Sequence, residues 1–121
     1  MNDASATTLA LMQRFNAAFV EHRPDLLAPL VAEDCVIENT VPAPNGARLV
    51  GRDACLALWQ ALAASGDGCF EPEDIEAFGE RAILRWRYRW GGGEADSVRG
   101  VNLMRVHDGR IVEALGYVKG S

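Results

Sequence analysis

The stretch that decides the fold reads Leu84-Arg85-Trp86-Arg87-Tyr88-Arg89-Trp90. Large apolar residues and arginines alternate strictly, which is the period of a β-strand with one buried side and one solvent-facing side. The four apolar residues are therefore expected to point inward and the three arginines outward. A sheet that is covered on one face follows from this pattern.

The residues after this stretch predict two more strands of the same sheet. Gly91-Gly92-Gly93 predicts a turn, and residues 98–106 predict the next strand. Asp108-Gly109 is a typical hairpin dipeptide, so residues 110–118 should return antiparallel. The residues expected on the inner side are Val98, Gly100, Asn102, Met104, Val106, Val112, Ala114, Gly116 and Val118.

The beginning of the chain is helical in pattern. Apolar residues recur at intervals of three and four between Leu11 and His22, which predicts an amphipathic helix. Ser5 or Thr7 can act as its N-cap, because a hydroxyl accepts a hydrogen bond from a free N–H of the first turn. Pro24 suits the first position of a second, short helix.

The middle of the chain completes the order of elements. Residues 35–41 predict a strand that ends at the segment 42–46, which contains two prolines, and residues 52–64 predict a third helix. Helices followed by consecutive antiparallel strands favour an α+β fold over a βαβ fold. With 121 residues and no linker or repeat, one domain over residues 1–121 is expected.

Composition excludes several classes of function. A net charge of -5 and a pI near 4.9 disfavour nucleic acid and anionic membrane surfaces as partners, since both need basic residues. No apolar run approaches the roughly 20 residues of a membrane span, and residues 1–8 lack a signal-peptide pattern, so a cytoplasmic location is expected. Cys35, Cys55 and Cys69 form neither a disulfide framework nor a zinc motif, and we expect them to fill the core.

Three stretches together resemble one known family. They are residues 13–19 (QRFNAAF), residues 32–39 (AEDCVIEN) and residues 101–111, which include the Asp108-Gly109 hairpin. This set is similar to the nuclear transport factor 2-like superfamily, in particular its branch of ketosteroid isomerases and SnoaL-like polyketide cyclases. The resemblance implies a cone, also called a cystatin-like roll, in which a curved antiparallel sheet and N-terminal helices enclose a mostly apolar cavity. It also implies a homodimer through the convex sheet face.

The isomerase residues of that family are replaced in this chain. Ketosteroid isomerase uses an Asp general base together with a Tyr and a protonated Asp as its oxyanion hole. By the resemblance, these three fall on Asn39, Phe15 and Asn102. An amide does not exchange protons at neutral pH and Phe15 has no hydroxyl, so steroid isomerisation by that mechanism is not expected.

Three residues are the candidates for a catalytic role. Asn102 keeps an NH2 group that can polarise a carbonyl in an apolar cavity, or it is a buried amide satisfied by its neighbours. Asn39 either binds a ligand or caps the end of a strand. Glu38 is the carboxylate nearest to the expected pocket and is a candidate base if it faces inward, although alternation with Asn39 places it outward as a surface charge.

The remaining pattern predicts the wall of the pocket. The residues expected to bind a ligand are Phe15, Phe19, Trp59, Trp86, Tyr88, Met104 and Val118, with core packing as the alternative for each aromatic residue. No metal ligands pair at a recognisable spacing and no Gly-rich loop opens a helix, so we expect neither metal nor cofactor. His22 and His107 lack catalytic partners in the sequence, and the arginines are expected to pair with glutamates across strands.

Three functions remain open from these observations. The first is a cofactor-independent isomerase, cyclase or lyase that acts on an apolar or polycyclic carbonyl compound through Glu38, Asn39 and Asn102. The second is a non-catalytic binding module for a small hydrophobic molecule, which the loss of the proton-handling side chains favours. The third is a protein-interaction domain that uses the convex face of the sheet.

Overall fold

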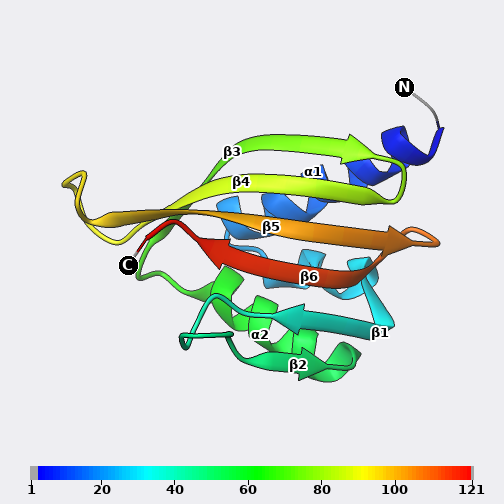
Figure 1. Cartoon of the computed structure of the whole chain (residues 1–121), viewed down its shortest axis with the longest axis horizontal. Coiled ribbons are helices and arrows are strands. Elements are labelled where there is room, and N and C mark those ends of the chain that lie inside the picture. The colour runs from blue at the N-terminus through cyan, green and yellow to red at the C-terminus, as the bar shows by residue number, and fades with distance from the viewer. Residues whose placement is uncertain (1–2, 121) are drawn as a thin grey trace.

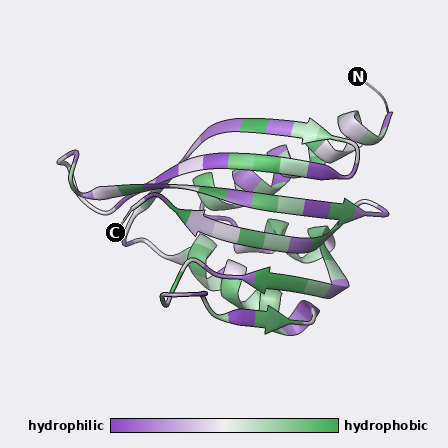
Figure 2. Ribbon diagram, viewed as in Figure 1, coloured by the Kyte–Doolittle hydropathy of each residue, from purple (hydrophilic) through white to green (hydrophobic). Residues whose placement is uncertain are grey.

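The alternating stretch forms the second of four long antiparallel strands. The computed structural model describes residues 3–120, and its longest strands follow one another as predicted from the sequence. They are β3 (Cys69–Phe78), β4 (Arg81–Arg89), β5 (Ser97–His107) and β6 (Arg110–Val118). Figure 2 shows hydrophobic and hydrophilic residues alternating along β3 and β4.

Two further strands extend the sheet beyond β6. β1 (Val31–Glu38) pairs with β6, and the short β2 (Arg48–Val50) pairs with β1, so the strand order is β2-β1-β6-β5-β4-β3. The α+β class is confirmed, but the sheet is not wholly antiparallel, because β1 runs parallel to β6. Parallel neighbours need a long connection between them, and here α2 and four strands of the sheet, β2, β3, β4 and β5, supply it.

The helices cover one face of this sheet. α1 (Asp3–Val20) packs on β3 and β4, and α2 (Arg52–Ala64) packs on β1 and β2. Figure 1 shows both helices behind the sheet, with its strands twisting across them. Between α1 and β1 the chain forms two short 3-10 helices, η1 (Pro24–Leu26) and η2 (Ala28–Leu30), where one short helix was predicted. Pro29 lacks an N–H group and breaks the regular helical pattern there.

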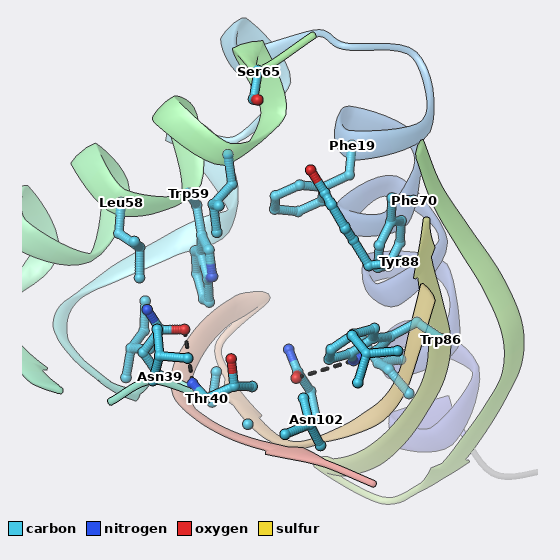
Figure 3. A pocket seen from close by; sticks show the side chains of 18 of the residues that line it. Phe19, Asn39, Thr40, Leu58, Trp59, Ser65, Phe70, Trp86, Tyr88 and Asn102 are labelled. Carbon is cyan, nitrogen blue, oxygen red and sulfur yellow. Dashed lines mark hydrogen bonds between the residues drawn. The ribbon is translucent and has the colours of Figure 1, made fainter. Parts of the chain in front are cut away.

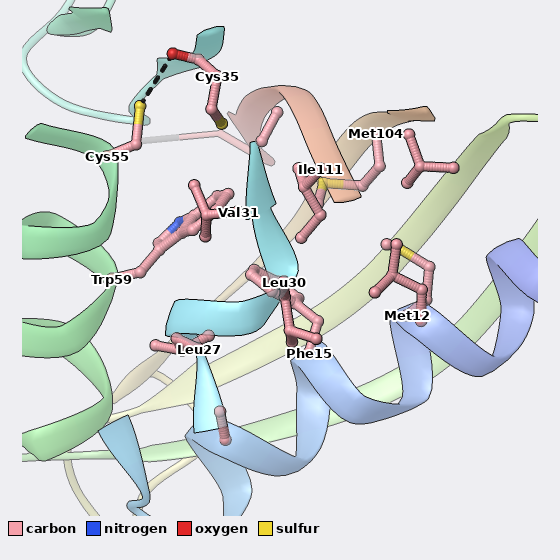
Figure 4. Packing of buried hydrophobic residues seen from close by; sticks show 14 of the residues in the cluster. Met12, Phe15, Leu27, Leu30, Val31, Cys35, Cys55, Trp59, Met104 and Ile111 are labelled. Atoms are coloured by element: carbon pink, nitrogen blue, oxygen red, sulfur yellow. Dashed lines mark hydrogen bonds between the residues drawn. The ribbon is translucent and has the colours of Figure 1, made fainter. Parts of the chain in front are cut away.

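The core lies between the helices and the inner face of the sheet. α1 contributes Leu11, Met12 and Phe15, which are at most 3% exposed, and α2 contributes Cys55 and Trp59. Figure 4 shows Met12, Phe15, Cys55 and Trp59 meeting residues of η2, β1, β5 and β6. Burial of one such apolar side chain stabilises the fold by about 1.5–3 kcal/mol. The N-terminal amphipathic helix is therefore a main source of the stability of the sheet.

Local signals fixed several boundaries correctly. α2 spans the predicted residues 52–64, and β6 spans the predicted residues 110–118. Asp108 and Gly109 have φ of 50° and 74°, as the two central residues of a tight hairpin turn require. No helix among residues 3–120 has the length and hydropathy needed to cross a membrane.

Two predicted boundaries are wrong. α1 begins at Asp3, so neither Ser5 nor Thr7 caps it. β1 spans residues 31–38 rather than 35–41, because the chain enters the strand directly from η2. Asn39 then turns the chain out of the sheet, and its side-chain oxygen accepts a hydrogen bond from the next amide, that of Thr40, at 2.8 Å.

Candidate functional site

Inward-facing residues of the sheet form rows that cross from strand to strand. Ala82, Met104 and Ala114 form one row and are at most 2% exposed, which places them at the closed end of the molecule. The next row towards the open end contains Leu84, Asn102 and Gly116. A cavity of about 370 Å³ extends from this second row to the ends of α1 and α2, and Ala114 of the first row also lines it. Its volume lies within the range of small-molecule sites.

Aromatic side chains form a continuous wall along this cavity. Ring centroids are 4.9 Å apart for Phe15 and Trp59 and for Phe15 and Phe19, 5.6 Å for Phe19 and Phe70, and 6.1 Å for Phe70 and Trp86. All four pairs are tilted or edge-to-face, the arrangement that aromatic rings prefer. The helices and β3–β4 thus contribute one apolar surface to the site.

Asn102 presents an oriented amide to this apolar space. Its Oδ1 accepts a hydrogen bond from Nε1 of Trp86 at 3.2 Å. An indole N–H can only donate, so the amide oxygen must face Trp86 and the NH2 group must face away from it. Figure 3 shows the NH2 end pointing into the open part of the cavity. No residue among those described accepts a hydrogen bond from this NH2 group.

Two glycines make this arrangement possible. A Cβ atom at Gly100 would lie 2.5 Å from the Trp86 ring, so only glycine allows the indole to lie across β5 and reach Asn102. A Cβ atom at Gly116 would lie 3.0 Å from the Thr40 methyl group and 3.4 Å from the Asn102 amide oxygen. The small residue at position 116 therefore keeps the inner end of the cavity open.

Asn39 and Glu38 lie next to each other but face different surroundings. Asn39 borders the cavity beside Thr40, to whose amide it is hydrogen-bonded (Figure 3). Glu38 pairs in register with Leu115 and Arg48, and its carboxylate lies 3.0 Å from the Arg48 guanidinium. Its main chain reaches the inner surface, where its carbonyl oxygen lies beside Gly116. The structure brings Asn39 and Asn102 to one cavity and directs the Glu38 carboxylate to an ion pair.

The predicted wall residues surround this cavity with one exception. Phe15, Phe19, Trp59, Trp86, Tyr88 and Val118 all border it. Met104 does not, because it lies one row deeper in the core and is 2% exposed. There it is the register partner of Ala82 on β4 and of Ala114 on β6. Trp90, which was predicted to line the inside, does not border the cavity, although its ring centroid lies 6.5 Å from that of Tyr88. β4 ends at Arg89, and the Trp90 side chain is 55% exposed in the following loop.

The sequence reasoning missed several residues of the site, among them Phe70 and His22. Phe70 links Phe19 to Trp86, and its place depends on its register opposite Tyr88, which the sequence pattern does not give. His22 lies at the rim, and its Nδ1 is 3.1 Å from the carbonyl oxygen of Ala63. No sequence signal identifies His22, because its partner belongs to α2, 41 residues away.

The cysteines and the arginines lie away from the cavity. Cys35 and Cys55 are fully buried, and burial raises the pKa of both thiols. Cys69 is exposed, so the prediction that it fills the core is wrong. On the outer face, the predicted cross-strand ion pairs form at 2.9 Å for Arg89–Glu71, 3.0 Å for Arg99–Glu73 and 3.7 Å for Arg105–Glu113.

Comparison with known proteins identifies the family of this chain. Residues 12–114 match the model of the SnoaL-like domain family. A crystal structure of a protein of unknown function from Mesorhizobium loti, described as NTF2-like, shares 56% identity over 99% of this chain and 97% of that chain, with a TM-score of 0.92. No curated protein matches the sequence.

More distant structures share the fold. A candidate ketosteroid isomerase from Kribbella flavida has 22% identity over 97% of this chain and 81% of that chain, with a TM-score of 0.80. An LEH-like epoxide hydrolase from M. tuberculosis has 18% identity over 98% and 83% of the two chains, with a TM-score of 0.75. The protein therefore belongs to the SnoaL-like domain family and has the nuclear transport factor 2-like fold.

Proposed function

We propose that the protein acts on a compact apolar carbonyl compound as a cofactor-independent isomerase, cyclase or lyase. The observation that carries this proposal is the Asn102 amide, which Trp86 orients at 3.2 Å so that its NH2 group faces an aromatic cavity. A fixed donor in an apolar space stabilises negative charge that develops on a carbonyl oxygen during proton removal. The isomerase, cyclase and epoxide hydrolase neighbours agree with chemistry in this cavity, although a shared fold does not decide the function.

Asn39 supports the same kind of ligand. Its oxygen is occupied by the Thr40 amide at 2.8 Å, so its NH2 group is the part left for a ligand. Both amides of the cavity therefore use their oxygens within the protein. A site with such donors favours a ligand whose polar atom accepts hydrogen bonds, such as a ketone or an enolate, over one whose polar atom only donates.

Binding of a ketone tests this proposal directly. A probe such as 1-tetralone should raise the melting temperature of the wild type, because a ligand that binds only the folded state stabilises it. Asn102→Leu should weaken the affinity roughly tenfold, the effect of losing one hydrogen bond of about 1.4 kcal/mol. Asn45→Leu, at an exposed position outside the cavity, is the matched control. Equal affinities of wild type and Asn102→Leu would overturn the proposal.

Catalysis is tested separately from binding. Glu38 stays the predicted proton carrier for turnover, although its carboxylate is engaged by Arg48. Once a substrate is found, activity that survives the combined change Glu38→Gln, Asn39→Leu and Asn102→Leu would rule out the assigned residues. The opposite result, binding of ketones without turnover by the wild type, would favour the second candidate function, a non-catalytic binding module. Amides in place of the isomerase acids support that alternative.

We also propose that the protein forms a homodimer through the outer face of its sheet. Leu115, Leu103 and Ile83 are register neighbours on β6, β5 and β4, and Tyr117 with Val101 continues the apolar surface in the next row. Leu103 is 40% exposed and Tyr117 is 53% exposed. Apolar patches of this kind on a surface otherwise rich in ion pairs are typical of protein interfaces.

A further inference from the structure

The rim of the cavity holds an imidazole that the proposed function does not use. α1 ends at Val20, and His22 follows with a left-handed φ of 54°. The amide of Arg23 donates to the carbonyl of Ala18 at 2.8 Å, and the amide of His22 donates to that of Phe19 at 3.4 Å. These two bonds form a Schellman C-cap, in which glycine usually occupies the left-handed position. Glycine would avoid the steric cost there, so the turn alone does not explain a histidine.

A hydrogen bond to α2 fixes both the ring and its tautomer. Nδ1 of His22 lies 3.1 Å from the main-chain carbonyl oxygen of Ala63. A carbonyl can only accept, so Nδ1 carries the proton and Nε2 of the neutral ring is left as an acceptor. Main-chain carbonyls commonly orient functional histidines in this way. No residue among those described occupies Nε2.

Glu21 precedes this histidine on the exposed surface, and the charged groups that follow it are paired. Arg23 and Asp25 form an ion pair with each other at 2.7 Å, and Glu38, the carboxylate residue that borders the cavity, pairs with Arg48 at 3.0 Å. Imidazole is the side chain that exchanges protons in the neutral range. Among the described residues that border the cavity, His22 is the only histidine.

We propose that Nε2 of His22 receives the proton of an acidic hydroxyl on the ligand whose carbonyl oxygen is bound by Asn102. The two groups lie at opposite ends of the aromatic wall. Figure 3 shows Asn102 at one end and Phe19 and Ser65, which mark the ends of α1 and α2, at the other. This inference rests on the proposed function and names its ligand class, a compact ring ketone conjugated to an acidic hydroxyl.

The proton transfer balances without any further reactant. The O–H bond of the ligand breaks, its proton forms an N–H bond at Nε2, and the neutral imidazole becomes an imidazolium. The electron pair left on the oxygen delocalises through the conjugated ring onto the carbonyl oxygen. The NH2 group of Asn102 stabilises the negative charge there. Donor and acceptor at the two ends of the cavity thus act on one conjugated system.

Two bicyclic probes test this inference. 6-Hydroxy-1-tetralone carries a hydroxyl conjugated to its ketone, and 6-methoxy-1-tetralone has the same ring without the acidic proton. We expect the wild type to bind the hydroxy probe at least tenfold more tightly and to shift its absorption to longer wavelength, the signature of the phenolate. His22→Gln should lose both the preference and the shift while it still binds the methoxy probe. His107→Gln, which changes the exposed histidine outside the cavity, should keep both.

The outcomes separate this inference from the proposed function. A preference and a spectral shift that persist in His22→Gln would overturn the role of His22. Ketone binding that depends on Asn102 without any gain from the hydroxyl would overturn it too, and would leave the proposed function intact. Failure of all three tetralones to bind would contradict both. If His22→Gln does not fold, the ¹⁵N shift of the wild-type Nε2 decides, since it must move with the hydroxy probe and not with the methoxy probe.

Discussion

Neighbouring groups determine which end of each amide in the cavity is available to a ligand. Asn102 is oriented by the Trp86 indole, and Asn39 by the Thr40 amide. In each case an N–H group of the protein occupies the oxygen, so the NH2 group is what a ligand meets. Replacement of the isomerase acids by amides therefore retains hydrogen-bond donation at the inner end of the cavity and removes proton exchange there.

The buried thiol of Cys35 should make the stability of the protein depend on pH in the alkaline range. Burial, with a smaller contribution from Cys55, raises the pKa of its thiol in the folded state. The unfolded chain releases this proton above about pH 8.5, whereas the folded protein keeps it, so the stabilisation is complete below that pH and is lost as the pH rises. The free energy of unfolding should therefore fall more steeply above pH 9 in the wild type than in Cys35→Ala, by up to about 1.4 kcal/mol per pH unit.

Urea unfolding at several pH values between about 8 and 10.5 measures this difference. Cys69→Ala is the matched control, because Cys69 is exposed and its loss should leave the wild-type slope unchanged. Only the slope matters, since removing a buried side chain also lowers stability at every pH. Parallel curves for wild type and Cys35→Ala would show that the buried thiol does not control this titration.

At the scale of elements, α1 is attached to the β3–β4 turn by side chains rather than by a cap. The Thr8 hydroxyl donates to the carbonyl of Gly79 at 2.7 Å, and the amide of Gly79 donates to Ser5 Oγ at 2.8 Å. Both hydroxyls lie on the buried side of the helix. They hold the helix against the sheet at the closed end of the molecule, and this position directs the other end of α1 towards the cavity.

Thr8→Val tests this attachment. Valine keeps the shape and the helix propensity of threonine but leaves the Gly79 carbonyl without its donor, so unfolding should become easier by about 0.5–1.5 kcal/mol. Thr7→Val makes the same change one residue earlier, on the exposed side of the helix, and should alter stability by less than about 0.5 kcal/mol. Chemical denaturation compares the two variants, and equal effects would show that the hydrogen bond contributes nothing.

Element boundaries could be predicted where the signal is local. The Asp108-Gly109 turn, the bounds of α2 and the alternation along β4 depend on residues adjacent in the chain. β1 was placed four residues too late at its start, because its pairing is decided by β6, a strand from the other end of the chain. The same long-range choice makes this one pair parallel. Periodicity describes which side of a strand is apolar, but it does not identify the neighbouring strand.

At the scale of the whole molecule, the sheet separates two surfaces. Its inner face changes along the strands from the packed row at Met104 to the open row at Asn102 and Gly116, which lines the cavity. Its outer face holds an apolar patch around Leu103 that is bordered by Arg99–Glu73 and Arg105–Glu113. The structure therefore places the candidate ligand site and the proposed dimer surface on opposite sides of the same strands.

The proposed homodimer can be tested by a substitution in the apolar patch of the outer face. Leu103→Arg would place a charge at the centre of the patch and should reduce the mass in solution from a dimer to a monomer, because an unpaired charge in an interface is costly. Light scattering after size exclusion measures the mass. Val20→Arg, which changes an exposed apolar residue at the end of α1, should remain dimeric. A wild type that is monomeric at micromolar concentration would contradict the proposal.

The sequence by itself determined the α+β class, the alternation that divides the sheet into two faces and six of the seven residues predicted for the wall of the cavity. These depend on periodicity and on local turn chemistry, which are encoded within a few adjacent residues. The tertiary structure decided that Met104 is core, that Trp90 is exposed, that Glu38 pairs with Arg48 and that His22 lies at the rim. Each of these depends on how far the residue lies from the open end of the cavity or on a partner distant in the chain. Periodicity indicates the side on which a residue lies, but only packing determines how deep it lies and what it meets.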